Sequence, residues 1–208
     1  MDPGNRLFYR LIRFIAWVIC KILFRHRAEG HENLPTSGPF LLAVNHTSNL
    51  DPVLAGIAMK RPLAFMARST LFSPAPMGWF LRNLNALPLE REGVGIAGFR
   101  SVMAHLDAGG AALVFPEGTR SADGRLRRFK GGVVRLAKMA QVPVVPAYIS
   151  GSHRAMGRGK WLPRPFGTRI SFGECIDKEA FSEEDNGLEV LRRAMVELIP
   201  EGEPGSVD

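Results

Sequence analysis

Short apolar runs alternate with longer stretches of helical periodicity along most of the chain. The clearest runs, at 39–45 (PFLLAVN), 111–115 (AALVF) and 142–149 (VPVVPAYI), are almost wholly apolar. Runs of this length and composition are typical of strands that are buried on both faces of a sheet. Together with the helical stretches between them, they predict one α/β domain, with a mixed central sheet flanked by helices.

The remaining segments complete this pattern. Further strands are expected at 62–67, 86–89 and 169–172. Helices are expected at 52–60, 76–83, 96–108, 131–140 and 188–199. The segment 150–167 is rich in glycine, proline and basic residues and is expected to be a surface loop, and the tail 201–208 is expected to be flexible.

Residues 6–27 combine basic and apolar side chains with helical periodicity. One face carries Trp17 and the basic residues, which are Arg6, Arg10, Arg13, Lys21 and Arg25. The other face is apolar and carries Leu11, Ile12, Ile15, Val18, Ile19 and Ile22. The longest uncharged run, 14–20, is much shorter than the ~20 residues that span a bilayer, and no small-residue cleavage site follows. Residues 1–27 are therefore predicted to form a basic amphipathic helix on a membrane surface; the alternative is a helix packed on its own domain.

Composition narrows the classes of partner and of site. The 27 Lys and Arg exceed the 20 Asp and Glu, so the formal charge is +7, which suits nucleic acid, an anionic membrane or an anionic substrate. Nucleic-acid binding is not expected, because the sequence has no recognisable module or aromatic stacking platform. Cys20 and Cys175 are isolated, which predicts a reducing compartment, and no histidine or cysteine spacing predicts a metal site.

His46 and Asp51 lie in the polar stretch NHTSNLDP, directly after the run at 39–45. Residues five apart on a regular helix diverge by about 140°, but a strand, a turn and a helix start can bring them together. Asp51 would then accept a hydrogen bond from one imidazole nitrogen, which leaves the other as a base near neutral pH. Alternatively, Asp51 is only the N-cap of the helix that begins with Pro52, and His46 only ends a strand.

Glu117 and Arg120 have the same position in their own unit, because FPEGTRS leaves the apolar run at 111–115. Ligands bind at the carboxyl ends of strands in open α/β sheets. A basic run follows, opposed only by Asp123, and consists of Arg120, Arg125, Arg127, Arg128 and Lys130. Such a run is either a solvated loop or, beside a candidate base, a phosphate site.

Four motifs in this order resemble those of the glycerolipid acyltransferases, and the resemblance covers about residues 28–175. NHTSNLD resembles the family's Asn-His-four-spacer-Asp motif, and FPEGTRS its Phe-Pro-Glu-Gly-Thr-Arg motif. GWFLRNLNALPLER, which ends at Arg91, resembles the second motif, and VPVVPAYISG, from Val142 to Gly151, the fourth. Within this family, the sequence resembles the bacterial 1-acylglycerol-3-phosphate acyltransferases. Where many members have a lysine before the second motif, this sequence has Arg68.

The resemblance implies that residues 28–200 form an acyltransferase domain in which His46 is the general base and Asp51 orients it. It implies an acceptor pocket built by Glu117, Gly118, Thr119 and Arg120, with Arg68, Arg91 and Lys130 adding positive charge. The sequence has no G-x-S-x-G elbow, which agrees with a reaction that needs no protein nucleophile. Val144, Val145 and Pro146 would line an acyl channel or simply belong to a buried strand.

The implied substrates are lysophosphatidate and an acyl thioester of coenzyme A or acyl carrier protein, with no other cofactor. The expected location is the cytoplasmic face of the cell membrane, where the protein would be peripheral or monotopic. Two alternatives are the same chemistry on another acceptor, such as a lyso-ornithine lipid or glycerol 3-phosphate, and a noncatalytic membrane-lipid-binding protein.

Overall fold

The computed structural model describes residues 3–89 and 96–205. Within them, seven strands form one sheet in the order β1-β7-β6-β2-β5-β3-β4. The strands are β1 (Arg27–Glu29), β2 (Phe40–Val44), β3 (Leu63–Arg68), β4 (Ala86–Leu89), β5 (Ala111–Val114), β6 (Val144–Ser150) and β7 (Arg169–Phe172). Strands β2 to β6 are parallel, whereas β7 pairs antiparallel with β6 and β1 pairs parallel with β7. The predicted mixed central sheet is confirmed.

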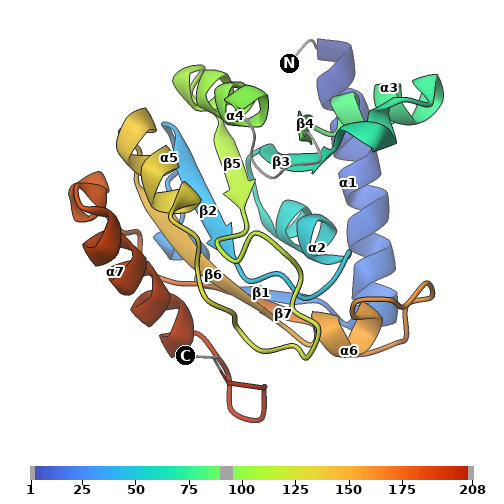
Figure 1. Cartoon of the computed structure of the whole chain (residues 1–208). Helices are drawn as coiled ribbons and strands as arrows, with labels where there is room; N and C mark the ends of the chain where they lie inside the picture. Colours follow the sequence, from blue (N-terminus) through green and yellow to red (C-terminus); the bar gives the residue numbers. More distant parts are fainter. Residues whose placement is uncertain (1–2, 90–95, 206–208) are drawn as a thin grey trace.

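Helices cover both faces of this sheet (Figure 1). They are α1 (Pro3–Phe24), α2 (Asp51–Ala58), α3 (Ala75–Asn83), α4 (Ile96–Asp107), α5 (Gly132–Ala140), α6 (Ser152–Met156) and α7 (Glu184–Glu197). Three short 3₁₀ turns join them: η1 (His31–Asn33), η2 (Ser69–Phe72) and η3 (Lys178–Phe181). Helices α1 and α2 pack on one face and α4, α5 and α7 on the other, which gives a three-layer domain.

The central strand β2 contains no polar residue because helices cover both of its faces. Phe40, Leu42 and Val44 point to the α1 and α2 side, and Leu41 and Ala43 point to the α4, α5 and α7 side. All five side chains are fully buried. Because successive strand residues face opposite sides, a strand covered by helices on both faces must be apolar at every position.

Helix α1 packs on its own domain along one side and keeps an apolar stripe exposed on another. Tyr9, Cys20 and Phe24 are buried, and the guanidinium of Arg13 donates to the carbonyl of Met59. The exposed apolar side chains of the helix are Leu7, Leu11, Phe14, Ile15, Trp17, Ile19, Ile22 and Leu23. The helix therefore packs on its own domain along one side and still exposes an apolar stripe that could face a membrane. Its contact with a membrane stays a prediction. None of the described helices has the length and apolar character that crossing a bilayer requires.

One strand and one α-helix of the described residues were not expected from the sequence. Strand β1 forms although its three residues are mostly polar, because its backbone pairs with Arg169–Ser171 of β7. Helix α6 lies at the start of the segment 150–167 that was expected to be a loop throughout. It begins after Gly151, whose positive φ of 76° turns the chain at the end of β6.

Candidate active site

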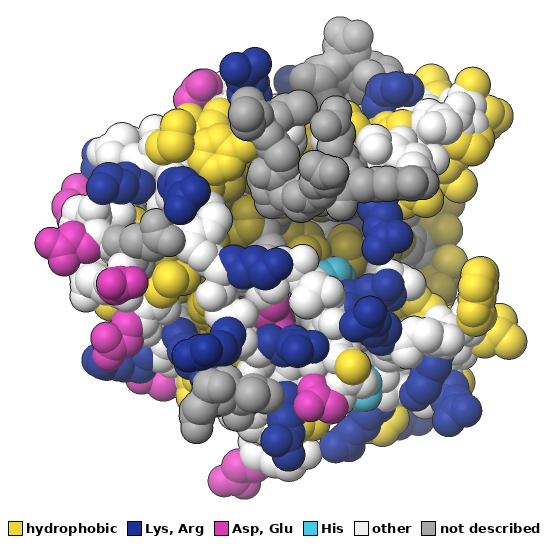
Figure 2. Space-filling model, viewed as in Figure 1, with side chains coloured by type: hydrophobic (Ala, Val, Ile, Leu, Met, Phe, Trp, Pro, Cys, Tyr) yellow, Lys and Arg dark blue, Asp and Glu magenta, His cyan; other side chains and the backbone are white. Residues whose placement is uncertain are grey.

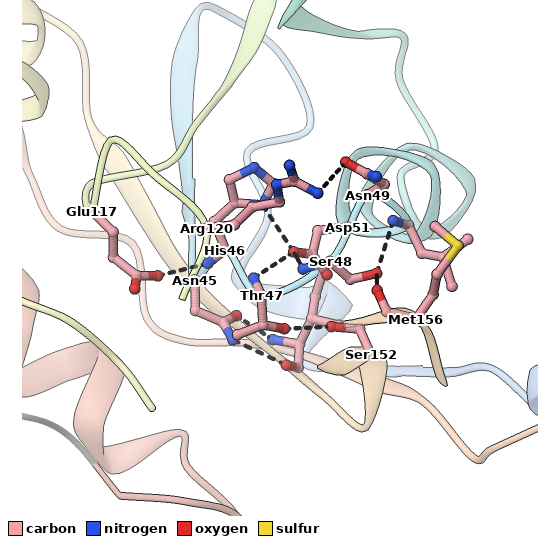
Figure 3. A network of polar contacts seen from close by, with 12 residues as sticks. Asn45, His46, Thr47, Ser48, Asn49, Asp51, Glu117, Arg120, Ser152 and Met156 are labelled. Atoms are coloured by element: carbon pink, nitrogen blue, oxygen red, sulfur yellow. Dashed lines mark hydrogen bonds and ion pairs between the residues drawn. The ribbon is translucent and has the colours of Figure 1, made fainter. Parts of the chain in front are cut away.

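The two polar motifs meet at the carboxyl edge of the sheet, because the strands that carry them are neighbours. His46 follows β2 and Glu117 follows β5, and these strands pair in parallel. The backbone N–H of His46 donates to Oε1 of Glu117 at 2.6 Å, and the N–H of Ser121 donates to the carbonyl of His46 at 2.7 Å. Segments about seventy residues apart in sequence thus form one site (Figure 3).

The side chains of His46 and Asp51 face each other across the turn. Nδ1 of His46 lies 2.9 Å from Oδ2 of Asp51, which is fully buried, whereas the imidazole is 18% exposed. An ionised carboxylate only accepts hydrogen bonds, so Nδ1 carries the proton and Nε2 has a free lone pair. No described residue hydrogen-bonds Nε2. The arrangement is that of an oriented general base, with the second nitrogen open to a ligand.

The carboxylate of Asp51 does not cap helix α2, so the alternative reading of this residue as an N-cap is wrong. Helix α2 begins at Asp51 itself and its N-cap is Leu50. Oδ2 instead accepts the backbone N–H groups of Thr47, at 2.8 Å, and Ser48, at 2.7 Å, which precede the helix. The side chain bends back because three donors converge on one oxygen there. It therefore holds the turn and the imidazole in one geometry.

Two further residues position His46, and sequence reasoning assigned neither of them a role. The ring of Phe115 stacks on the imidazole with a centroid distance of 3.8 Å and an interplanar angle of 13°. The side chain of Asn45 is buried and bonds both ways to Ile149 of β6: Nδ2 donates to the carbonyl and Oδ1 accepts the N–H. Asn45 directly precedes His46, and Phe115 is the first residue of FPEGTRS. Their places in the two motifs were the only sign in the sequence that they could act at the site.

Glu117 is buried beneath the turn and accepts two backbone hydrogen bonds. Oε1 accepts the N–H of His46, and Oε2 accepts the N–H of Arg127 at 3.0 Å. Burial raises the pKa of this carboxyl to about 7, while the two N–H groups act in the opposite direction. A buried carboxylate in this position connects the backbone of the candidate base to the basic loop that follows β5. Its predicted contact with a substrate stays a prediction.

Arg120 lies at the rim of the site, where its guanidinium donates to Oδ1 of Asn49 at 2.8 Å. Gly118 and Thr119 are exposed on the same loop. Gly118 has a positive φ of 65°, and a β-carbon there would approach the side chain of Lys130 to 2.9 Å. Lys130 therefore lies along the backbone of Gly118. The predicted residues Gly118, Thr119, Arg120 and Lys130 thus lie close together on this loop.

Of the two other basic residues predicted for the site, Arg68 and Arg91, the structure describes only Arg68. Arg68 is exposed at the end of β3, the strand next to β5, so it lies at the same edge of the sheet. Arg91 lies outside the described residues. Figure 2 shows Lys and Arg side chains gathered on this face of the molecule. Val144 and Val145 are fully buried in β6 and belong to the two cores on opposite faces of the sheet, as expected for a buried strand.

Helix α6 also holds the turn that carries His46. The hydroxyls of Thr47 and Ser152 lie 2.8 Å apart, and Oγ of Ser48 donates to the carbonyl of Met156 at 2.6 Å (Figure 3). Ser48 also forms an isolated antiparallel bridge with Gly157. The turn is therefore bonded to the loop after β5, to β6 and to α6, so the imidazole is held by several parts of the fold.

Comparisons with known proteins agree with this geometry. The family described as Acyltransferase matches residues 25–150. A 1-acyl-sn-glycerol-3-phosphate acyltransferase of Bacillus subtilis is 31% identical over 158 residues, which are 75% of this chain and 76% of that protein. The chloroplastic 1-acyl-sn-glycerol-3-phosphate acyltransferase LPAT1 of Arabidopsis thaliana is 32% identical over 163 residues, which are 76% of this chain. The crystal structure of the 1-acyl-sn-glycerophosphate acyltransferase from Thermotoga maritima matches with a TM-score of 0.82 and 28% identity, over 93% of this chain and 79% of that chain.

The matched lengths differ between relatives. The chain spans 45% of the Arabidopsis protein and 47% of a similar chloroplastic protein from Brassica napus. The shared part contains both polar motifs, because the family match includes His46, Asp51, Glu117 and Arg120. With the α/β fold and the geometry of these residues, this match shows that the chain belongs to the acyltransferase family.

Proposed function

We propose that this protein transfers an acyl chain from a thioester to the free hydroxyl of 1-acylglycerol 3-phosphate, with phosphatidate and a free thiol as products. The observation that carries this proposal is the His46–Asp51 pair at the carboxyl edge of the sheet, with Nε2 unbonded among the described residues. The names of the relatives from Bacillus subtilis and Thermotoga maritima support the choice of acceptor. The donor is a thioester of coenzyme A or of acyl carrier protein.

In the proposed reaction, Nε2 of His46 takes the proton of the acceptor hydroxyl as its oxygen attacks the thioester carbon. Asp51 keeps the Nδ1–H tautomer in place and stabilises the imidazolium that forms. The tetrahedral intermediate then collapses, the carbon–sulfur bond breaks, and the proton on Nε2 passes to the departing sulfur. The ring of Phe115 and the carboxylate of Glu117 keep the imidazole in position through contacts with its face and its backbone.

The acceptor phosphate fits the basic rim of the site. Among the described residues, the guanidinium of Arg120 has the side-chain amide oxygen of Asn49 as its hydrogen-bond partner, and no described carboxylate pairs with it. A guanidinium can clasp a phosphate with two parallel hydrogen bonds. Lys130 beside Gly118, and Arg68 at the end of β3, add positive charge near the same edge.

The proposed substrates are amphiphiles, and the exposed stripe of α1 suits a membrane-surface location. Leu7 and Ile22 are each 72% exposed and Phe14 is 61% exposed, while basic residues line the flank of the helix. Apolar side chains flanked by basic residues are the pattern of a helix that lies in the bilayer interface. We place the protein on the cytoplasmic face of the membrane, as a peripheral or monotopic enzyme.

Acceptor discrimination in a thiol-release assay tests the proposal. The assay uses both donors against lysophosphatidate, a monoacylglycerol without phosphate, glycerol 3-phosphate and a lyso-ornithine lipid. We expect a preference for lysophosphatidate. Arg120→Ala should lower its kcat/KM about ten- to hundredfold, the effect of losing a hydrogen bond to a charged group, and should reduce the preference. Arg193→Ala removes an exposed guanidinium from α7 and serves as the matched control.

The base is tested in the same assay. His46→Ala should lower kcat by about 10²-fold or more while the protein remains folded. Near-normal thiol release by the folded variant would exclude His46 as the base. If the wild type uses the phosphate-free lipid equally well, the acceptor assignment is wrong, and the basic run is only a solvated loop.

A further inference from the structure

The loop between α6 and β7, residues 157–167, exposes large apolar side chains that the proposed reaction does not use. Trp161 is 94% exposed and Leu162 is 81% exposed, the two highest values among the large hydrophobic side chains that the structure describes. An exposed indole next to an exposed leucine is unfavourable in water, because their apolar surface stays hydrated. We name this segment the Trp161 loop.

Basic residues surround this apolar tip. The loop itself contains Arg158, Lys160 and Arg164, and no acidic residue occurs between 150 and 173. Tryptophan prefers the interface between lipid headgroups and acyl chains, and nearby cations attract anionic lipids. The composition of the loop therefore matches an anionic bilayer surface better than a protein core or a nucleic acid.

One end of the loop is bonded to the carboxyl end of α1. The N–H of Thr168 donates to the carbonyl of Phe24 at 2.9 Å, and the N–H of Arg27 donates to the carbonyl of Thr168 at 3.1 Å. The hydroxyl of Thr168 also contacts Nδ1 of His26 at 2.9 Å. The loop consequently lies beside the lower end of α1 in Figure 1, and Figure 2 shows apolar side chains along part of the right-hand edge of this face, with basic side chains below them.

The other end of the loop is bonded to the turn that carries the base. Gly157 bridges Ser48, whose hydroxyl donates to the carbonyl of Met156. Ser48 is two residues from His46. The guanidinium of Arg154 lies 5.3 Å from the ring centroid of Phe166, which stiffens the base of the loop. The loop is therefore attached at one end to α1 and at the other to the turn that carries His46.

We propose that the Trp161 loop is a second bilayer contact, in which Trp161 and Leu162 insert into the interface of an anionic membrane. Arg158, Lys160 and Arg164 contact the lipid phosphates. A single interfacial helix leaves the domain free to roll about the helix axis, whereas a second contact away from that axis fixes the roll. The loop and α1 together therefore hold His46 at a defined height above the bilayer. This inference rests on the proposed membrane location.

Fluorescence of Trp161 tests the insertion directly. Trp17→Phe and Trp79→Phe leave Trp161 as the only tryptophan. With vesicles that contain phosphatidylglycerol, we expect a blue-shifted emission and quenching by brominated acyl chains; with pure phosphatidylcholine, both changes should be smaller. If the protein sediments with the vesicles and the emission of Trp161 does not change, the loop does not insert. This readout needs no catalytic turnover, so it stays informative if the proposed reaction is wrong.

A double variant tests the consequence for activity. Trp161→Ser with Leu162→Ser should weaken vesicle binding about tenfold or more, because two interfacial apolar side chains are lost. Turnover of bilayer-embedded lysophosphatidate should fall similarly, whereas turnover of a monomeric short-chain lysophosphatidate should not change. The matched control is Met139→Ser, which alters another 59% exposed apolar side chain, on α5.

Three outcomes of this experiment would overturn the proposal. Unchanged vesicle binding would show that the loop makes no membrane contact. An equal loss on the monomeric acceptor would show that the loop acts on the site itself. A change in the oligomeric state of the double variant, seen by light scattering, would show that the apolar tip contacts a second copy of the chain instead.

Discussion

Replacing Glu117 with glutamine tests whether the buried carboxylate holds the candidate base in place. The two oxygens of Glu117 accept backbone N–H groups from opposite sides, His46 on one and Arg127 on the other. Glutamine has nearly the same size, but one of its two terminal atoms is an NH₂ group. Whichever way the amide is turned, it places a donor against a backbone donor.

The structure allows the size of the effect to be estimated. The side chain is only 2% exposed, so water cannot easily satisfy the displaced N–H. A buried donor that loses its partner costs about 1–3 kcal/mol, and we expect Glu117→Gln to lower the free energy of unfolding by that amount. Repulsion at either N–H shifts the side chain to which the backbone of His46 is bonded and so displaces the imidazole, so kcat should fall about tenfold or more.

The loss of stability should depend on pH, because only the wild type titrates at this position. Burial raises the pKa of Glu117 from its ordinary value of 4.5 to about 7. The folded state therefore binds this proton more tightly than the unfolded state, and wild-type stability falls as pH rises through this range. The loss of stability in Glu117→Gln should therefore be largest in acid and become smaller as pH rises toward 7.

Urea unfolding of both proteins at several pH values, with thiol release measured in parallel, checks this prediction. Glu189→Gln is the matched control, because it makes the same chemical change at an exposed ion pair with Arg193 on α7 and should leave stability unchanged. If Glu117→Gln equals the wild type in stability at every pH and in turnover, the carboxylate does not hold the turn. The reasoning from its two hydrogen bonds would then be refuted.

Three further substitutions probe single contacts. Asp51→Asn keeps the shape but removes the charge that orients Nδ1 of His46, so kcat should fall about 10²-fold or more in the thiol-release assay; unchanged turnover would contradict the pairing. Asn45→Ala leaves the N–H and carbonyl of Ile149 without their side-chain partner and should lower the free energy of unfolding by about 2–5 kcal/mol, measured by urea unfolding. Gly30→Ala places a β-carbon 2.2 Å from the carbonyl oxygen of Phe172, whereas Gly38→Ala meets no atom within 4 Å, and both glycines have positive φ. Thermal unfolding should therefore show a larger loss for Gly30→Ala, and equal losses would mean that backbone strain alone decides.

The sequence by itself determined the fold class and the main elements. Strands β2 and β5 could be predicted because helices cover both faces of the sheet, which requires an uninterrupted apolar run. The amphipathic character of α1 was also visible, since helical periodicity is a local property. The two polar motifs could be located because each directly follows a buried strand, and their chemistry could be proposed from residue types alone.

Tertiary structure decided how those residues act. The sequence left open whether Asp51 caps a helix or orients His46, because residues five apart meet only if the intervening turn folds back. It does so because Thr47 and Ser48 donate to the same carboxylate oxygen as the imidazole. The role of Glu117 as a backbone acceptor for His46 depends on the pairing of β2 with β5. Hydrogen bonds between segments seventy or more residues apart leave no periodic pattern in the sequence, so only the folded chain specifies them.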